Sequence, residues 1–233
     1  MVAGASAGWT SLVMDVDDDD SVSTGVAKVV AERGGLDAVV ACAGWGLAGA
    51  VEQTPIDQAK RQFETNFWGA VRVVRASLPV MRRQGGGRVV LVSSIGGVVA
   101  LPFQAFYSAS KFALEGYGEA LAYEVAPFGI EVTLVQPGNV RTDFTQNRLD
   151  VAAPEGEDVY ADMVAKSVGL MERQEQDGVP PGDVATVIAR VLASRRPRRR
   201  VSVGKPDERV GIIAKRLLPW RTFERAAKGS LGV

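Results

Sequence analysis

Short apolar runs alternate along this chain with longer segments of helical periodicity, and this alternation limits the fold more than any other feature. Strands are expected at residues 10–16, 36–44, 88–94, 130–138 and 199–205, and helices at 21–35, 54–84, 105–126 and 182–194. The apolar runs are continuous, as in strands whose two faces are both covered. The pattern therefore predicts β-α-β units and an α/β fold with a doubly wound parallel sheet.

We expect one domain over residues 1–233, because this length suits a single α/β unit. Thr54 to Asp57 resemble a capping box that opens the helix over 54–84, and glycines 85–87 end it. Residues 143–181 are the least regular stretch and follow a strand, so we expect a lid over the substrate there. Residues 206–233 form a basic amphipathic tail.

The chain has no histidine, which excludes Ser-His-Asp catalysis and every histidine-based metal site, and no metal is expected. Residues 4–8, GASAG, match the G-x-S-x-G pattern of a hydrolase nucleophile at Ser6. That interpretation fails because it needs a histidine base and a preceding strand. The single cysteine, Cys42, fits a reducing compartment, and we expect a cytoplasmic protein.

The formal net charge is zero, but residues from Arg195 onward contain twelve Lys or Arg and three Asp or Glu. Such a tail can contact nucleic acid or anionic lipid, cover the pocket or pack on a neighbour, and packing on its own domain is the favoured reading. We expect no nucleic-acid partner. Stable membrane insertion is not expected either, because the longest apolar runs are too short to span a bilayer.

The most informative stretch is SSIGGVVALPFQAFYSASK, residues 93–111. Tyr107 and Lys111 are four residues apart and share one helix face, while Ser94 lies thirteen residues before Tyr107. An ammonium near a phenol stabilises the phenolate, which lowers the tyrosine pKa toward the range useful for proton transfer. Ser94 would then hold the reacting oxygen by a hydrogen bond.

This constellation resembles the classical short-chain dehydrogenase/reductase family and its Rossmann-type fold. The resemblance continues at Asn66 in FETNFWG, at PGNVRT (137–142), at Asp15 and more weakly at ACAG (41–44). It implies a catalytic set of Asn66, Ser94, Tyr107 and Lys111, in which Asn66 anchors a proton-relay water and Lys111 also grips the nicotinamide ribose. The cofactor-binding residues that it implies are Asp15, Ala43, Gly44, Tyr107, Lys111, Pro137, Gly138, Val140 and Thr142.

Several of these residues can also be interpreted as having a purely structural role. Tyr107 and Lys111 fit a pair on a helix surface, and Ser94 or Thr142 fits a cap. Asp15 precedes four consecutive aspartates, which fit a solvated loop and the start of a helix. Cys42 stands where the family usually has asparagine, and we interpret it as a small buried side chain.

GASAG also matches the glycines of a T-G-x-x-x-G-x-G cofactor loop, at Gly4 and Gly8, but no strand precedes it and no helix follows. The N-terminal β-α-β unit that binds the cofactor in the family is therefore interpreted as missing, either through an incomplete or shortened sequence or in a natural short form. We expect residues 10–16 to take the vacant place and pair in parallel with residues 36–44, joined by a right-handed crossover helix at 21–33.

The resemblance implies an NAD(P)-dependent enzyme that interconverts an alcohol and a ketone or aldehyde. The alternative is a cofactor-free member with a regulatory or assembly role. Phe103, Phe144, Tyr160 and Met163 suggest an apolar small-molecule substrate, although an ordinary core would use the same residues. The family habit also implies a homo-oligomer, and the choice between NAD and NADP stays open.

Overall fold

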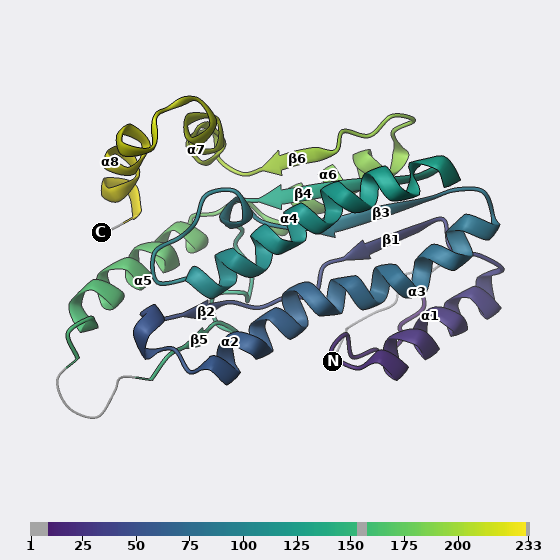
Figure 1. Cartoon of the computed structure of the whole chain (residues 1–233), viewed down its shortest axis with the longest axis horizontal. Coiled ribbons are helices and arrows are strands. Elements are labelled where there is room, and N and C mark those ends of the chain that lie inside the picture. The colour runs from purple at the N-terminus through teal and green to yellow at the C-terminus, as the bar shows by residue number, and fades with distance from the viewer. Residues whose placement is uncertain (1–8, 153–157, 232–233) are drawn as a thin grey trace.

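The computed structural model describes residues 9–152 and 158–231, and it contains the expected parallel sheet (Figure 1). The four strands lie in the order β1-β3-β4-β6, and all three pairings are parallel. Their bounds are β1 Ala38–Ala41, β3 Gly87–Val92, β4 Ile130–Pro137 and β6 Arg200–Val203. A separate two-stranded sheet joins β2 (Leu47–Ala48) to β5 (Leu149–Asp150). The prediction of an α/β fold is confirmed.

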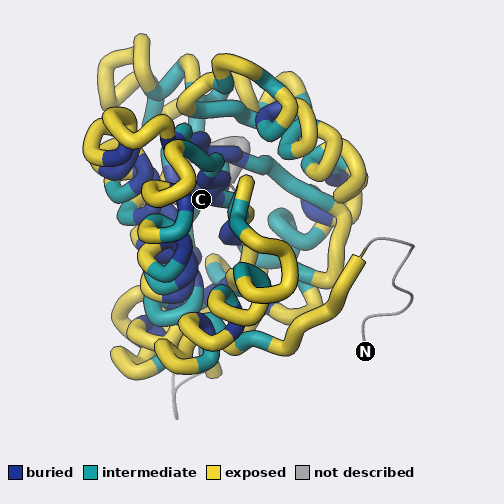
Figure 2. The backbone as a smooth tube through the Cα atoms, turned by 90° about the vertical axis from the view of Figure 1, so that its right-hand side faces the viewer, coloured by how far each residue is buried: buried dark blue, intermediate teal, exposed yellow. Residues whose placement is uncertain are grey.

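Helices cover both faces of the four-stranded sheet (Figure 1). On one face, helices α3 (Ala70–Arg83) and α4 (Ala105–Val125) pack their apolar side chains against alternate residues of the strands, including Val89, Leu91 and Val132. On the other face, Val90 and Val135 meet the apolar side of α6 (Pro181–Ala193). Buried residues therefore line the inner sides of the helices, while their outer sides are exposed (Figure 2).

One long helical stretch runs from residue 56 to residue 83 with a change of pitch in the middle. The helices of this half are α1 Asp19–Arg33, α2 Ile56–Phe63, the π-helix η2 Glu64–Gly69, α3 Ala70–Arg83 and α4 Ala105–Val125. Short 3-10 turns are η1 Val51–Gln53, η3 Ile95–Gly97 and η4 Ala126–Phe128. The expected capping box is wrong, because the Thr54 hydroxyl donates to the Ala50 carbonyl at 2.7 Å and Pro55 precedes α2 without a side-chain cap.

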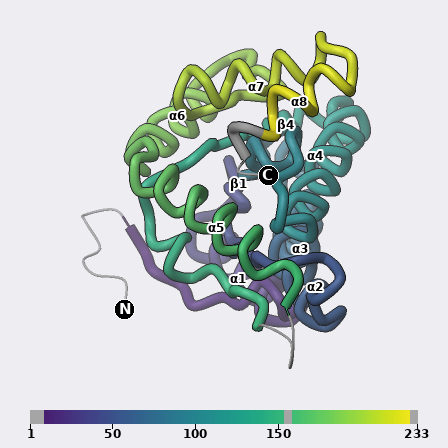
Figure 3. The backbone as a smooth tube through the Cα atoms, turned by 90° about the vertical axis from the view of Figure 1, so that its left-hand side faces the viewer, coloured from purple at the N-terminus to yellow at the C-terminus, as the bar shows by residue number. Residues whose placement is uncertain are grey.

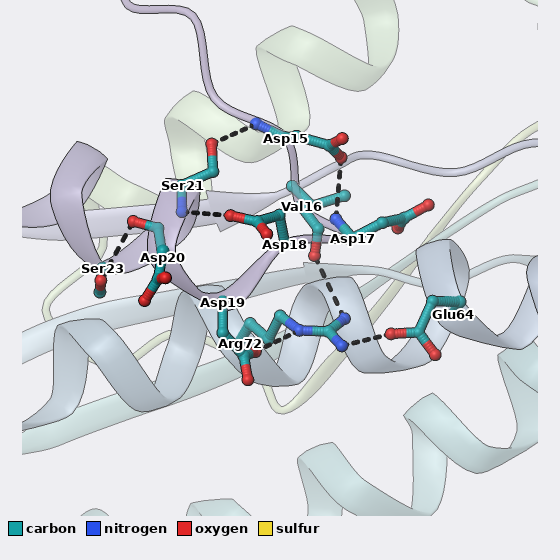
Figure 4. A network of polar contacts seen from close by, with 10 residues as sticks. All are labelled: Asp15, Val16, Asp17, Asp18, Asp19, Asp20, Ser21, Ser23, Glu64 and Arg72. Carbon is teal, nitrogen blue, oxygen red and sulfur yellow. Dashed lines mark hydrogen bonds and ion pairs between the residues drawn. The ribbon is translucent and has the colours of Figure 1, made fainter.

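The expected strand at residues 10–16 does not form. These residues lie outside the sheet, and β1 pairs with β3 alone among the strands of the described residues. The segment instead follows helices: Met14 contacts Gly25 of α1 and Val16 contacts Gly69 of η2. Arg72 of α3 accounts for this placement, since it binds Asp19, Glu64 and the Val16 carbonyl (Figure 4). The proposed crossover and its pairing with residues 36–44 are therefore wrong.

The C-terminal half is more helical than its sequence suggests. Its helices are α5 Ala161–Gln176, α6 Pro181–Ala193, α7 Pro206–Leu217 and α8 Trp220–Leu231. Helix α5 occupies much of the region expected to be irregular. The strand arrows point to the left in Figure 1, and α5, α7 and α8 lie on that side of the molecule (Figure 3). No helix of the described residues is long and apolar enough to cross a membrane.

Candidate active site

Ser94 follows β3 at the carboxyl edge of the sheet and opens the turn η3. Its hydroxyl oxygen accepts a hydrogen bond from the Gly96 amide at 2.9 Å, and the hydroxyl donates to the Pro137 carbonyl at 3.4 Å. Its side chain also lies beside Tyr107, and its hydrogen-bonding capacity lowers the pKa of the tyrosine, which favours the phenolate. Ser94 is thus both the cap of a turn and a neighbour of the expected catalytic tyrosine.

Tyr107 lies in the first turn of α4 and is buried. The Phe144 ring meets the tyrosine ring edge-to-face, with 5.8 Å between the centroids. Burial raises the pKa of Tyr107 to about 12, the hydrogen bond from Ser94 opposes this shift, and the negative charge of Glu175 adds to it. In this structure Tyr107 is therefore a protonated phenol at neutral pH, in the form that donates a proton.

Lys111 lies one turn after Tyr107, and only 5% of its surface is exposed. Its ammonium donates to the Val92 carbonyl at 3.0 Å and lies 6.0 Å from the centroid of the Tyr107 ring. Burial lowers the pKa of Lys111 to about 8. The expected lowering of the tyrosine pKa is wrong for this structure, because burial of the phenol raises it.

Asn66 is fully buried in the π-helix η2, between the end of β1 and α4. Its Oδ1 accepts from the Trp45 amide at 2.9 Å, while its Nδ2 donates to the Trp45 carbonyl at 3.0 Å and to Ser110 Oγ at 3.2 Å. A single π-helical turn inside an α-helix often marks a functional site. Here it places the asparagine amide beside the helix that carries Tyr107 and Lys111.

The loop after β1 adjoins this cluster. Cys42, Ala43 and Gly44 are exposed, so the interpretation of Cys42 as a buried side chain is wrong. The reason is the position of β1 at the edge of the described sheet. A Cβ atom added at Gly44 would lie 3.0 Å from Asn66 Oδ1 and 3.5 Å from Lys111 Nζ, so glycine leaves the approach to both groups open.

The segment after β4 supplies the remaining expected contacts. The Gly138 amide donates to the Val203 carbonyl at 2.7 Å, and Val140 forms a bridge with Val179. Thr142 Oγ1 accepts from the Phe144 amide at 3.2 Å, so it does form a turn. Pro137, the last residue of β4, accepts the Ser94 hydrogen bond, which joins this segment to the cluster of Ser94, Tyr107 and Lys111.

Asp15, the expected adenine contact, forms its hydrogen bonds with residues near it in the chain and not with Ser94, Tyr107 or Lys111. Its carboxylate accepts from the Asp17 amide at 2.9 Å, and its own amide donates to Ser21 Oγ at 2.8 Å (Figure 4). The side chain is exposed. The residues of GASAG lie outside the described part of the chain.

Sequence reasoning missed a clasp between the loop of Phe144 and α5. Thr145 Oγ1 donates to Glu175 at 2.6 Å, and the buried Arg148 guanidinium pairs with Glu175 at 3.1 Å and with Glu172 at 3.2 Å. The clasp holds Phe144 against Tyr107. No local sequence pattern predicts these contacts, because the partners are about thirty residues apart and only the fold brings them together.

The fold and the cluster together define a Rossmann-type α/β oxidoreductase, with Ser94, Tyr107 and Lys111 gathered where the strands end. The family model described as short chain dehydrogenase matches residues 3–152. The chain therefore belongs to the short-chain dehydrogenase family.

Individual relatives agree with this assignment. The chain is 43% identical to the 3-ketodihydrosphingosine reductase of Bacteroides thetaiotaomicron, over 93% of this chain and 81% of that protein. It is 37% identical to retinol dehydrogenase 8 of Bos taurus, over 86% of this chain and 67% of that protein. A short-chain dehydrogenase structure from Streptomyces avermitilis is 33% identical and superposes with a TM-score of 0.77, over 94% of this chain and 79% of the other.

Proposed function

We propose that this protein is an NAD(P)-dependent oxidoreductase that interconverts a ketone or aldehyde and an alcohol. The observation that carries the proposal is the placement of Ser94 beside the buried Tyr107, with the Lys111 ammonium on the next turn, 6.0 Å from the centroid of the tyrosine ring. A serine and a phenol that face one another can both donate to one carbonyl oxygen. Membership of the short-chain dehydrogenase family supports the same chemistry.

The residues around Lys111 fit a dinucleotide at its nicotinamide end. Gly44 is exposed and has no side chain to block access to Asn66 and Lys111. Lys111 has three ammonium protons and the Val92 carbonyl takes one, so further protons are suited to a ribose hydroxyl. In this proposal Asp15 would contact the adenine. The nicotinamide and its ribose would be lined by Ala43, Gly44, Tyr107, Lys111, Pro137, Gly138, Val140 and Thr142.

In the reduction, Tyr107 transfers its hydroxyl proton to the carbonyl oxygen of the substrate. When bound, the reduced cofactor supplies the hydride that the carbonyl carbon takes, so the product is an alcohol. Ser94 donates a hydrogen bond to the same oxygen and holds it beside Tyr107. Lys111 places positive charge near the phenolate that remains, and Asn66 would hold a relay water through which Tyr107 regains a proton.

For the substrate we propose an apolar carbonyl compound. Phe144 lies on the Tyr107 ring, so an apolar surface borders the reacting hydroxyl. The relative named 3-ketodihydrosphingosine reductase makes 3-ketodihydrosphingosine the first compound to test. Cytoplasmic location and a homo-oligomeric state remain part of this proposal, on the habit of the family.

A titration of the purified chain with NADH and NADPH, followed by reduced-nicotinamide fluorescence, tests the proposal. We expect saturable binding of at least one cofactor and weaker binding by Lys111→Met. The control is Lys166→Met, which removes an exposed lysine of α5. A folded, monodisperse wild-type sample that binds neither cofactor would overturn the proposed enzyme.

The second candidate is a family member that lacks the N-terminal cofactor-binding unit and has a regulatory or assembly role. It is favoured by β1, which forms the outer edge of the described sheet, and by the Asp15 carboxylate, which accepts from the nearby Asp17 amide. Unpaired strand edges are suited to pairing with another chain. Absent cofactor binding together with an oligomer in sedimentation velocity would support this role and count against the enzyme.

A further inference from the structure

Helices α7 and α8 carry a row of large apolar side chains that face solvent. Val210, Ile213 and Leu217 follow one another at intervals of three and four along α7, so they share a face. Trp220 begins α8 immediately afterwards. These side chains are 60%, 56%, 76% and 67% exposed, in chain order. A helix that needs its apolar face only to pack on its own domain would bury such a row.

Basic side chains flank this row. Arg209, Arg216, Arg221 and Arg225 are exposed, and none of them enters an ion pair among the described residues. On α8, Arg221, Arg225 and Lys228 follow at intervals of four and three and share a face. Lys228 pairs with Glu224 at 3.4 Å. The outward surface of the two helices therefore combines apolar groups with an excess of positive charge.

The inner side of α7 is firmly attached to the loops of the active site. Glu208 accepts from the Asn139 amide at 2.9 Å, directly after Gly138. Lys215 donates to the Val98 carbonyl, in the turn that Ser94 opens, and its ammonium lies 4.8 Å from the centroid of the Phe112 ring. Because these contacts fix the rotation of α7, the row from Val210 to Leu217 is held outward.

We propose that the outward face of α7 and α8 docks peripherally on an anionic lipid bilayer. Apolar side chains beside an exposed tryptophan and several arginines are the composition of helices that lie in the interface of a membrane. Anionic headgroups match these arginines in charge, and each basic residue near such a surface strengthens binding roughly fivefold. Docking would bring the carboxyl edge of the sheet, which α7 and α8 border in Figure 3, close to the bilayer.

Cosedimentation of the full chain with vesicles tests the docking, and it does not depend on turnover. We expect binding to vesicles of phosphatidylcholine with 30% phosphatidylglycerol (about one anionic lipid in three), at least tenfold weaker binding to pure phosphatidylcholine, and weakening in high salt. The Trp220 emission should shift to shorter wavelength on binding, and Trp220→Phe should remove that change.

Matched variants separate the face from general surface effects. Leu217→Ser with Trp220→Ser should weaken vesicle binding at least tenfold, as should Arg216→Glu with Arg221→Glu. The apolar control is Val13→Ser with Tyr123→Ser, and the basic control is Arg195→Glu with Arg196→Glu, all at exposed positions outside α7 and α8. Equal binding by the face variants and their controls would overturn the proposal. The proposal would also be overturned if the wild-type chain did not bind anionic vesicles. It would be overturned as well if the wild-type chain sedimented as a dimer and the face variants sedimented as monomers.

Discussion

At the scale of single residues, burial decides the protonation of the two groups that define the site. Burial disfavours the charged form of a side chain. It therefore raises the pKa of Tyr107 and lowers that of Lys111. The tyrosine therefore keeps its proton at neutral pH. Lys111 has its pKa near 8, so it loses its charge at a pH where an exposed lysine keeps it.

This shift predicts how Lys111 contributes to stability. The unfolded state binds more protons than the folded state between about pH 8, where folded Lys111 loses its proton, and its ordinary pKa of 10.5. The contribution of Lys111 to the free energy of unfolding must therefore rise with pH in that window. The wild-type value minus that of Lys111→Met should increase by about 2 kcal/mol between about pH 7.5 and pH 10.

Urea unfolding at several pH values measures this difference. Lys166→Met serves as the control for removal of a lysine from the surface. A difference between wild type and Lys111→Met that stays level or falls with rising pH would show that Lys111 is not buried as described.

The sequence identifies Ser94, Asn66, Tyr107 and Lys111 because their spacing is a local property that a motif can carry. Protonation cannot be read in the same way. The pKa of Tyr107 depends on Phe144, Glu175 and the packing around them, and these residues are far from it in the chain. The structure brings the four residues into neighbouring positions, while their catalytic roles stay predictions.

At the scale of elements, the π-helix η2 and the loop after β1 depend on one asparagine. Asn66→Ala leaves the part-buried Trp45 amide without its partner, while the Trp45 carbonyl keeps its bond from Gln62 and Ser110 Oγ keeps its bond to the Tyr107 carbonyl. A buried polar group without its hydrogen bond costs about 1–3 kcal/mol. We expect the free energy of unfolding to fall by about 2 kcal/mol, as measured in urea.

Asn147→Ala is the matched control for this variant, because Asn147 is exposed in the loop after β4. It should change the free energy of unfolding by less than about 0.5 kcal/mol. An Asn66→Ala protein as stable as this control would mean that the amide does not connect the loop to α4.

A second element-scale prediction concerns the attachment of α1 to α3. Arg72 binds Asp19, Glu64 and the Val16 carbonyl, and its side chain is largely covered (Figure 4). Arg72→Met should lower the free energy of unfolding by about 1–2 kcal/mol, a figure already reduced for solvent screening. Arg75→Met, an exposed neighbour on α3, should have little effect. Equal losses in the two variants would contradict the role given to Arg72.

The order of strands and helices could be predicted because continuous apolar runs and helical periodicity are properties of the amino-acid sequence itself. Residues 10–16 show the limit of that reasoning. Their apolar letters favour a strand, but Val13 is almost fully exposed, and Met14 and Val16 pack on helices. A strand forms only where a neighbouring strand can pair with it, and the hydrophobic periodicity of a segment does not predict which segment will lie beside it.

At the scale of the whole molecule, the candidate site residues and the C-terminal helices lie at one end. The strands β1, β3 and β4, which precede the candidate site residues, end there, and α7 is joined to the loops after β4 and β3 through Glu208 and Lys215. An apolar substrate and the proposed bilayer surface would then be reached from the same side (Figure 3). The arrangement supports an oxidoreductase that takes its substrate from an apolar environment.

We propose above that Tyr107 transfers the proton in a nicotinamide-dependent reduction. The most direct test is the oxidation of NADH or NADPH, followed by absorbance, with 3-ketodihydrosphingosine as substrate for wild type, Tyr107→Phe and the control Tyr123→Phe. We expect turnover by wild type and the control, and a loss of about a thousandfold in kcat for folded Tyr107→Phe. Undiminished turnover by Tyr107→Phe, or none by a folded wild-type protein, would contradict it.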